Sequence, residues 1–400
     1  MAVGLASMIV GMTAGRFLLP ARSEDPPADQ SASARVRTFL GKPGPWGQLH
    51  FVQIGIEPPP DQLDAERDYG HPLWFFRSLS RPQTEQLLRA ANPPPNALRA
   101  LLDESFWKVT PEGTWVGPTD GALLGLDPAS RGRIYGALAD IPQNTQRFPV
   151  PMRPDSIAER TGSSRLQPTT LDLWQRLLYP SGKWTFFADT PFVLSKLPQL
   201  EERRRFISML ARNVTYLVSL KVDASADIEG IARYWTFRGR KDSGPLLQSL
   251  SRVPGGSELD LAHLLPPMAR RRIYTYAKPT PNGVVDPRNC FWSAMNFFAE
   301  TPDDRFTDAD EMMRVLTAEY QMVDEPTFGD VVVMFDAQNQ PIHAASYLAD
   351  GLLFTKNGHT PFHPWMYATL DEIHELYSAM LPRSLPFTIR NFRRRPESRA

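Results

Sequence analysis

Cysteine is almost absent from this chain of 400 residues, which contains only one, Cys290. No disulfide can therefore form within the chain, and any thiol chemistry must involve that residue. An excess of charge of either sign is also missing, because 44 Lys and Arg residues balance 44 Asp and Glu residues. Binding to a polyanion requires concentrated positive charge. We therefore expect no nucleic-acid partner.

Motifs of cofactor and metal chemistry are missing as well. The chain has no glycine-rich phosphate loop, no HExxH motif and no paired-carboxylate signature. His359 and His363 are four residues apart, but Pro361 and Pro364 prevent the helix that would place both on one face. No repeat of fixed period is present, which argues against a solenoid. We expect neither a cofactor nor a metal site.

The remaining composition is that of a folded protein. Hydrophobic residues make up 42% and charged residues 22% of the chain, which excludes wholesale disorder. A chain of 400 residues exceeds a typical single core, so we expect two domains or one large composite domain. Proline is abundant, with 39 residues, and its runs interrupt regular structure.

The first residues have the composition of a targeting segment. Residues 1–15 are uncharged and rich in Ala, Gly, Val, Ile and Met, and Arg16 and a short apolar run follow. This pattern predicts a signal peptide or membrane anchor over residues 1–22, with a frayed or buried helix as the alternative. Residues 23–34 are rich in Pro, Ser, Ala and Asp and should form a flexible tether. We expect export or membrane attachment at the cell envelope.

Residues 35–272 show mostly helical signals and no motif with recognisable chemistry. Apolar residues at steps of three and four, together with capping residues, predict helices over 82–91, 96–102, 127–138, 170–178, 197–217 and 228–234. Residues 216–222 have a strand-like pattern. At the other end of the chain, residues 386–400 include an arginine-rich run that is typical of a solvated tail. The role of 35–272 stays open.

Cys290 is the candidate nucleophile. Asn289 precedes it and is a good N-cap, so the pattern places Cys290 in the first turn of a helix. Free backbone N–H groups and the positive end of the helix dipole stabilise a thiolate there, and the thiolate is the reactive form. The alternative is that Cys290 is a small buried hydrophobic residue.

His343 is the candidate base and lies in a predicted antiparallel sheet. An apolar run at 331–335, a second strand at 342–348 and a third at 352–356 follow one another along the chain. Asp350-Gly351 supplies a two-residue hairpin turn between the second and third strands. His343 therefore lies at the start of a central strand. A lone strand histidine is often structural, but a helix-capping cysteine upstream favours catalysis.

These segments resemble the NlpC and CHAP branches of the papain-like superfamily. The likeness rests on cysteine at a helix start, then Gly-Asp-Val-Val-Val-Met-Phe, then His-Ala-Ala-Ser-Tyr-Leu-Ala-Asp-Gly-Leu-Leu-Phe, and it covers residues 274–377. The resemblance implies an α+β, papain-like domain over 273–385, with a helix packed on an antiparallel sheet. Family members are largely bacterial cell-wall peptidases and amidases, so it also implies a peptide or peptidoglycan substrate. They usually have Asp-Cys-Ser-Gly where this chain has Asn-Cys-Phe-Trp.

The third catalytic residue has two candidates. The family's offset from His343 falls on Thr355, but Asn357 offers the carbonyl oxygen that orients an imidazole, and we prefer Asn357. Asn357 can instead be part of a turn. The backbone N–H of Cys290 would help to bind the oxyanion, with Tyr274 or Tyr276 as a second donor.

The sequence thus predicts a cysteine peptidase or amidase that cleaves amide bonds through Cys290 and His343. A mainly helical region precedes this domain. Two alternatives remain open. The first is a non-catalytic binding or scaffold protein on a papain-like fold, favoured by the altered residues beside the cysteine. The second is acyl transfer or deamidation by the same dyad, because water and amines attack the same acyl-enzyme.

Overall fold

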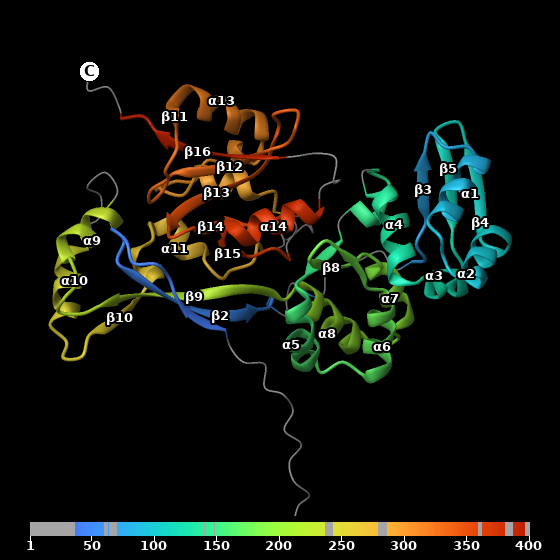
Figure 1. The fold of residues 1–400 in the computed structure, drawn as a ribbon, viewed down its shortest axis with the longest axis horizontal. Helices are drawn as coiled ribbons and strands as arrows, with labels where there is room; N and C mark the ends of the chain where they lie inside the picture. The colour runs from blue at the N-terminus through green and yellow to red at the C-terminus, as the bar shows by residue number, and fades with distance from the viewer. Residues whose placement is uncertain are drawn as a thin grey trace, which may run out of the picture. The chain divides into compact units, whose positions relative to one another are not determined.

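The computed structural model shows an α+β protein in which helices pack against antiparallel sheets (Figure 1). Val36–Ala400 forms one compact unit. Within it the structure describes residues 37–59, 63, 70–139, 141–147, 149–236, 243–278, 286–358, 362–380 and 387–396. The expected signal or anchor segment and the tether lie outside these residues. In the described part of the chain, no helix is long and apolar enough to cross a membrane.

The largest sheet has six strands in the order β11-β16-β12-β13-β14-β15, and all neighbours are antiparallel. The strands are β11 (Tyr320–Val323), β12 (Val331–Phe335), β13 (Pro341–Ala349), β14 (Leu352–Lys356), β15 (Trp365–Thr369) and β16 (Thr388–Arg394). The three strands predicted around His343 are confirmed. Both turn residues between β13 and β14 have positive φ, 49° at Asp350 and 74° at Gly351, as the predicted hairpin requires.

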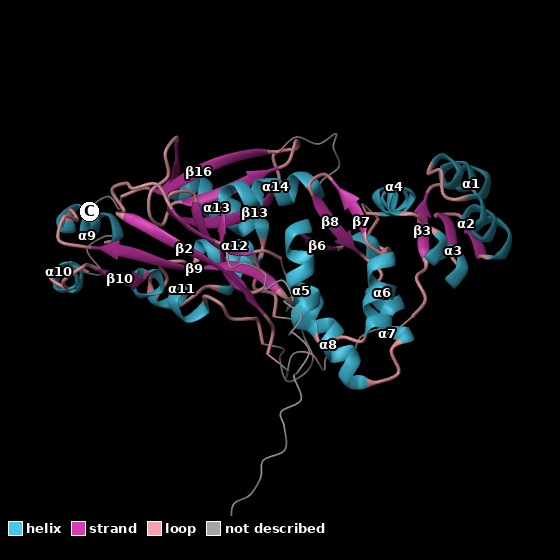
Figure 2. Cartoon of the chain, turned by 60° about the horizontal axis from the view of Figure 1, so that its bottom comes forward, coloured by secondary structure: helices cyan, strands magenta, loops and turns pink. Residues whose placement is uncertain are grey.

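Helices cover both faces of this sheet. Ala344 of β13 shares a hydrophobic cluster with Ala294, whereas the next residue, Ala345, shares another with Ile373. Successive side chains of a strand point to opposite faces, so α12 and α13 cover one face and α14 covers the other. Figure 2 draws these helices in cyan against the magenta strands. The helices are α12 (Cys290–Met295), α13 (Ala309–Glu319) and α14 (Leu370–Met380).

The arginine-rich segment near the C-terminus corrects one expectation. Instead of a solvated tail, residues 388–394 form β16, which lies between β11 and β12. Apolar residues between the arginines make this possible, since Ile389 and Phe392 join the two clusters on either side of the sheet. Arg393 also donates hydrogen bonds of 2.7 and 3.1 Å to the buried carboxylate of Asp330. Pairing with strands that are distant in sequence therefore places in the sheet a segment whose composition is typical of a solvated tail.

A second sheet has the order β1-β2-β9-β10 and shares a core with the first. One hydrophobic cluster includes Leu49, Trp235, Met268, Trp292 and Tyr367. Residues on both sides of the boundary expected between 272 and 273 thus bury their side chains together. The elements here are β1 (Thr38–Leu40), β2 (Gln48–Ile56), β9 (Asn213–Val222), β10 (Ser257–Asp260), α9 (Ile228–Trp235), α10 (Gly244–Ser251) and α11 (Pro267–Arg272).

The remaining part of the chain has a separate hydrophobic cluster and two small sheets, ordered β3-β5-β4 and β6-β8-β7. Helices are numerous between residues 37 and 272, but strands β1 to β10 lie among them, so the expected helical character describes this region only in part. The elements are β3 (Trp74–Arg77), α1 (Arg81–Ala90), α2 (Pro95–Arg99), β4 (Phe106–Thr110), β5 (Gly113–Gly117), α3 (Asp120–Gly125), α4 (Pro128–Leu138), β6 (Val150–Met152), α5 (Ile157–Ser164), α6 (Pro168–Arg176), β7 (Tyr179–Ser181), β8 (Trp184–Phe187), α7 (Thr190–Lys196) and α8 (Leu200–Ala211).

Local signals predicted most of these helices, and α8 shows where they fail. Asp127 caps α4 by accepting a 2.8 Å hydrogen bond from the Ser130 amide, as its position before Pro128 indicates. The helix predicted over 197–217, however, ends at Ala211. The residues that follow are rich in β-branched side chains, which favour the pleated strand β9 over a helix.

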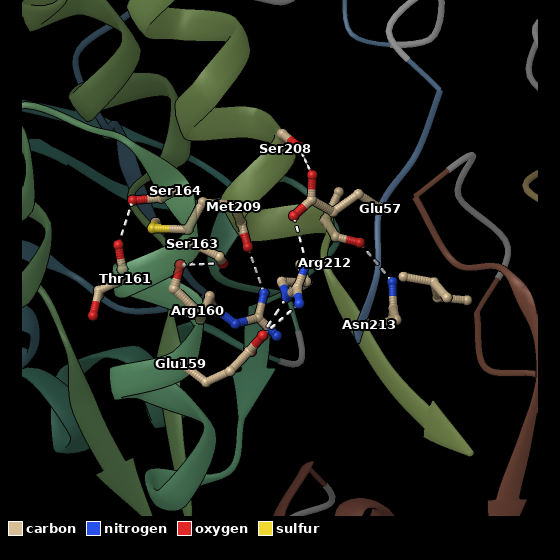
Figure 3. Close-up of polar contacts among 12 residues, drawn as sticks. Glu57, Glu159, Arg160, Thr161, Ser163, Ser164, Ser208, Met209, Arg212 and Asn213 are labelled. Carbon is tan, nitrogen blue, oxygen red and sulfur yellow. Dashed lines mark hydrogen bonds and ion pairs between the residues drawn. The ribbon is translucent and has the colours of Figure 1, made fainter. Parts of the chain in front are cut away.

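A network of charged residues joins the end of α8 to neighbouring segments (Figure 3). Arg212 forms ion pairs with Glu57, at 2.6 Å, and with Glu159 of α5. Arg160 donates hydrogen bonds of 2.6 and 3.0 Å to the carbonyls of Met209 and Leu210, which a helix end leaves unpaired. Burial lowers the pKa of Arg160 to about 10, so this guanidinium stays charged at neutral pH. The network fixes where α8 ends and β9 begins.

We predict that Arg212→Met lowers the free energy of unfolding by about 2 kcal/mol, because two carboxylates lose their shared partner. Urea unfolding measures the change. Arg314→Met is the matched control, since its side chain is 59% exposed and pairs with Glu311 on one helix surface, whereas that of Arg212 is 16% exposed. The control should change stability by less than about 0.5 kcal/mol. Equal losses in both variants would contradict a structural role for the network.

Candidate functional site

Cys290 is the first residue of α12, as predicted. The side chain of Asn289 accepts a 3.0 Å hydrogen bond from the amide of Trp292, which confirms Asn289 as the N-cap. α12 packs across β13 and β14, and its first turn lies over the start of β13. Cys290 is 8% exposed. The thiol is therefore held beneath the surface at the end of two neighbouring strands.

The surroundings of the sulfur have two opposing effects on the pKa of the thiol. Burial raises the pKa of the Cys290 thiol above its ordinary value. The amide of Ala344 on β13, the amide of Phe291 and the charge of Lys356 each oppose this rise, because they stabilise a thiolate. Burial has the larger effect, so the resting group is a thiol.

His343 is also buried and has two hydroxyl partners. Its Nε2 lies 3.1 Å from Oγ1 of Thr355, and its Nδ1 lies 2.9 Å from the hydroxyl of Tyr377 on α14. The residue is 1% exposed, and burial lowers the pKa of His343 to about 3. The imidazole is therefore neutral at physiological pH, with one nitrogen as donor and the other as acceptor.

Cys290 and His343 come to the same end of β13 but approach it from different sides. The helix that carries the thiol covers the face of Ala344, and the imidazole bonds to the helix on the opposite face. Among the described residues, no hydrogen bond joins the Cys290 sulfur to either ring nitrogen of His343. A thiolate–imidazolium pair thus requires the imidazole to exchange one hydroxyl partner for the thiol.

The residues expected to orient the imidazole or to bind the oxyanion differ in whether they lie near the site. Thr355 lies against the imidazole, whereas the buried Oδ1 of Asn357 has no hydrogen-bond partner in the described structure and so does not orient the ring. The hydroxyls of Tyr274 and Tyr276 donate to the carbonyls of Tyr216 and Ile56, at 2.7 and 2.9 Å. Neither tyrosine hydroxyl is therefore directed at the thiol.

Sequence reasoning missed two residues of this cluster. Lys356 is 0% exposed, and its Nζ donates a 2.8 Å hydrogen bond to the carbonyl of Gly358. Lysine is almost never fully buried. It follows Leu352 and Phe354 on one face of an apolar strand, so period-two alternation could have identified it as an inward-facing charge. Tyr377 has no such local signal, because its contact with His343 depends on where α14 packs.

One opening beside α12 is at the end of the helix away from the thiol. A cavity of about 330 Å³ is lined by residues that include Met295, Phe298, Tyr320 and Arg394, and Cys290 is not among them. Within the described ranges, no cluster of three or more His, Cys, Asp and Glu side chains is arranged to hold a metal ion. His359 lies outside the described residues.

We predict that His343 makes stability depend on pH. Its pKa is about 3 in the folded protein and 6.5 ordinarily, so the unfolded chain binds the extra proton between these values. The free energy of unfolding should therefore fall as the pH drops from 6.5 towards 3, by up to about 1.4 kcal/mol per pH unit.

His343→Gln should remove this part of the pH dependence while keeping hydrogen bonds to the two hydroxyls. Chemical denaturation at a series of pH values measures it. The exposed His263→Gln variant is the control and should follow the wild type. Parallel curves for the wild type and His343→Gln would show that His343 is not held neutral.

A thiol, an amine and an imidazole thus share the end of β13 and β14, each withdrawn from water. Together they offer a nucleophile, a positive charge and a proton acceptor, which are the groups that acyl transfer requires. Comparisons with protein-family models, with curated proteins and with solved structures found no significant match to this chain.

Proposed function

We propose that this protein is a cysteine hydrolase of papain-like fold that cleaves amide bonds with Cys290 as nucleophile. The observation that carries the proposal is the burial of Cys290, His343 and Lys356 at the same end of β13 and β14, at exposures of 8%, 1% and 0%. His343 lies on the face of the sheet opposite the other two. Groups with strongly perturbed pKa values gather at functional sites more often than elsewhere.

The energetic cost of this cluster supports the proposal. An ionisable side chain loses solvation on burial, and this loss destabilises the fold unless pairing compensates it. Apart from Thr355 and Lys356, the buried residues of β12 and β14 are apolar, so most of the sheet packs without polar groups. A cluster that the fold does not require is more readily explained by chemistry than by stability.

In the proposed reaction, His343 takes the proton of the Cys290 thiol once its ring releases one of the two hydroxyls. The thiolate attacks the carbonyl carbon of an amide, and the backbone N–H of Cys290 donates to the developing oxyanion. The imidazolium returns the proton to the departing amine as the C–N bond breaks. Water then hydrolyses the thioester and regenerates the thiol. Thr355 orients the imidazole in the place expected of Asn357.

The resemblance to cell-wall enzymes suggests peptides of peptidoglycan as substrates, at the cell envelope. This substrate class and location depend on the resemblance and on the residues before position 37. An amine that replaces water in the second step would convert hydrolysis into acyl transfer by the same residues.

A non-catalytic binding protein on the same fold is the second candidate. The specific observation in its favour is that both imidazole nitrogens already have hydroxyl partners, while burial keeps the thiol protonated. In that case the polar cluster would be a remnant and the thiol would be inert. Reactivity of the thiol separates the two candidates.

We predict that iodoacetamide alkylation of Cys290 abolishes cleavage of a library of short peptides and peptidoglycan stem-peptide fragments. The chain contains a single cysteine, so alkylation reports on this residue alone. Cys290→Ala should abolish turnover, and His343→Gln should lower kcat by about 100-fold or more. Mass spectrometry of the products measures cleavage.

Cys290→Ala that has been treated with the same reagent is the control for damage elsewhere. Turnover that survives alkylation would exclude Cys290 as the nucleophile. An unreactive thiol together with no turnover on any substrate would favour the binding protein.

A further inference from the structure

Lys356 lies on the strand next to the backbone that meets the thiol. In the β13–β14 ladder, Ser346 pairs with Phe354, and Ala344 and Lys356 each lie two residues beyond this pair, on the same face of their strands as the paired residues. Paired residues of neighbouring strands point to the same face, so the side chain of Lys356 lies on the face that α12 covers. The amide of Ala344 is one of those that donate to the Cys290 sulfur. The ammonium and the sulfur therefore share one side of the sheet.

Several groups hold the ammonium in this place. The carbonyl of Gly358 accepts its 2.8 Å hydrogen bond, and its nitrogen lies 5.6 Å from the ring centre of Trp365, the paired residue on β15. The guanidinium of Arg272 on α11 stacks on the same indole at 4.7 Å. Asp286, just before the N-cap of α12, contributes the nearby negative charge.

The face that α12 covers carries a further polar side chain with no structural use. Ser346 follows Ala344 on this face of β13 and is 0% exposed. Its hydroxyl has no hydrogen-bond partner among the described residues. On the opposite face, His343 is occupied by Thr355 and by the hydroxyl of Tyr377. The polar groups under α12 thus form a set separate from the imidazole.

We propose that Lys356 is the charge partner of Cys290, and that its ammonium stabilises the thiolate that attacks the substrate. This inference rests on the proposed role of Cys290 as a nucleophile and adds a residue to that site. The S–H bond breaks, the proton passes to the imidazole, and the negative charge on sulfur is balanced by the positive charge already on Nζ. Lys356 stays protonated through this step, so charge and protons are conserved.

The physical case depends on which group carries a charge at neutral pH. Burial lowers the pKa of His343 to about 3, so its ring is neutral before the reaction begins. Burial lowers the pKa of Lys356 to about 8, opposed by Asp286 and Cys290, so its amine is mostly charged at pH 7. An opposite charge inside a poorly solvated site has a strong effect on ionisation. Lys356 is therefore the better electrostatic partner for a thiolate.

A consequence for stability distinguishes this role from a structural one. The pKa of Lys356 is lower in the folded chain than its ordinary value of 10.5, so its charge costs stability below about pH 8. Lys356→Met keeps most of the buried stem and removes the charge. The variant should unfold at a higher temperature than the wild type at pH 7, whereas removal of a structural lysine would lower the melting temperature.

We predict that Lys356→Met raises the pKa of the Cys290 thiol by about 1, which means about tenfold less thiolate at any pH below it. The ultraviolet absorbance of the thiolate, followed by pH titration of the folded full chain, measures this without requiring reagent access. Subtraction of the titration of Cys290→Ala removes the absorbance of the 11 tyrosines, and the single cysteine assigns the remaining signal to Cys290. Lys356→Arg keeps the charge and should leave the thiol pKa unchanged.

Lys221→Met is the matched control, because Lys221 is an exposed lysine on β9, and it should leave the thiol pKa unchanged. The inference is overturned if Lys356→Met leaves the thiol pKa as it was, or if only His343→Gln raises it. Loss of folding in Lys356→Met would also contradict it, since the inference requires a more stable chain.

Failure of this inference and failure of the proposed function give different results. A raised thiol pKa in Lys356→Met, without amide cleavage by the wild type, would support the Cys290–Lys356 pair and refute the proposed hydrolase activity. Cleavage by the wild type with an unchanged thiol pKa in Lys356→Met would support the proposed hydrolase activity and refute the Cys290–Lys356 pair.

Discussion

The withdrawal of Cys290, His343 and Lys356 from water is the constraint on which the character of this protein depends. Each group prefers its uncharged form when buried, yet the proposed amide cleavage requires charge on at least one of them. The fold provides fixed polar partners for all three groups. The amide of Ala344 faces the sulfur, the carbonyl of Gly358 faces the ammonium, and two hydroxyls face the imidazole. Strands β13 and β14 supply two of these four partners, Ala344 and Thr355.

The rest of the sheet holds those two strands in place. Asp330, which precedes β12, accepts from the amide of Thr327 and pairs with Arg393 of β16. Gly329 beside it has φ of 86°, and a Cβ atom there would come within 2.0 Å of the ring of Phe298. The Gly-Asp pair is therefore a structural junction that connects the last strand, the start of β12 and the end of the cysteine-bearing helix. It positions the site without contributing to its chemistry.

Local signals made much of this arrangement predictable from sequence. Asn289 before Cys290, the apolar run of β12 and the Asp350-Gly351 turn each specify their own conformation within a few residues. Three features depended on distant partners instead. β16 pairs with strands that are distant in sequence and with Asp330. α8 ends where β9 begins to pair. The surroundings of the His343 side chain depend on which helix covers each face of the sheet. Periodicity gives the alternation of a strand but does not identify the partner on each face.

The position of the imidazole is the feature of the site that most limits its chemistry. Successive side chains of a strand point to opposite faces of the sheet, so those of His343 and Ala344 lie on different faces. A thiol that packs over Ala344 can therefore meet the ring of His343 only near the end of the strand. Both residues lie close to the start of β13, where the sheet pairing to β14 has already stopped at Ser346. On its other side β13 stays paired with β12 at this point, where His343 lies opposite Met334. In the proposed reaction the ring rotates away from Tyr377 and approaches the sulfur at this end of the strand, while Lys356 keeps its position on the face that α12 covers.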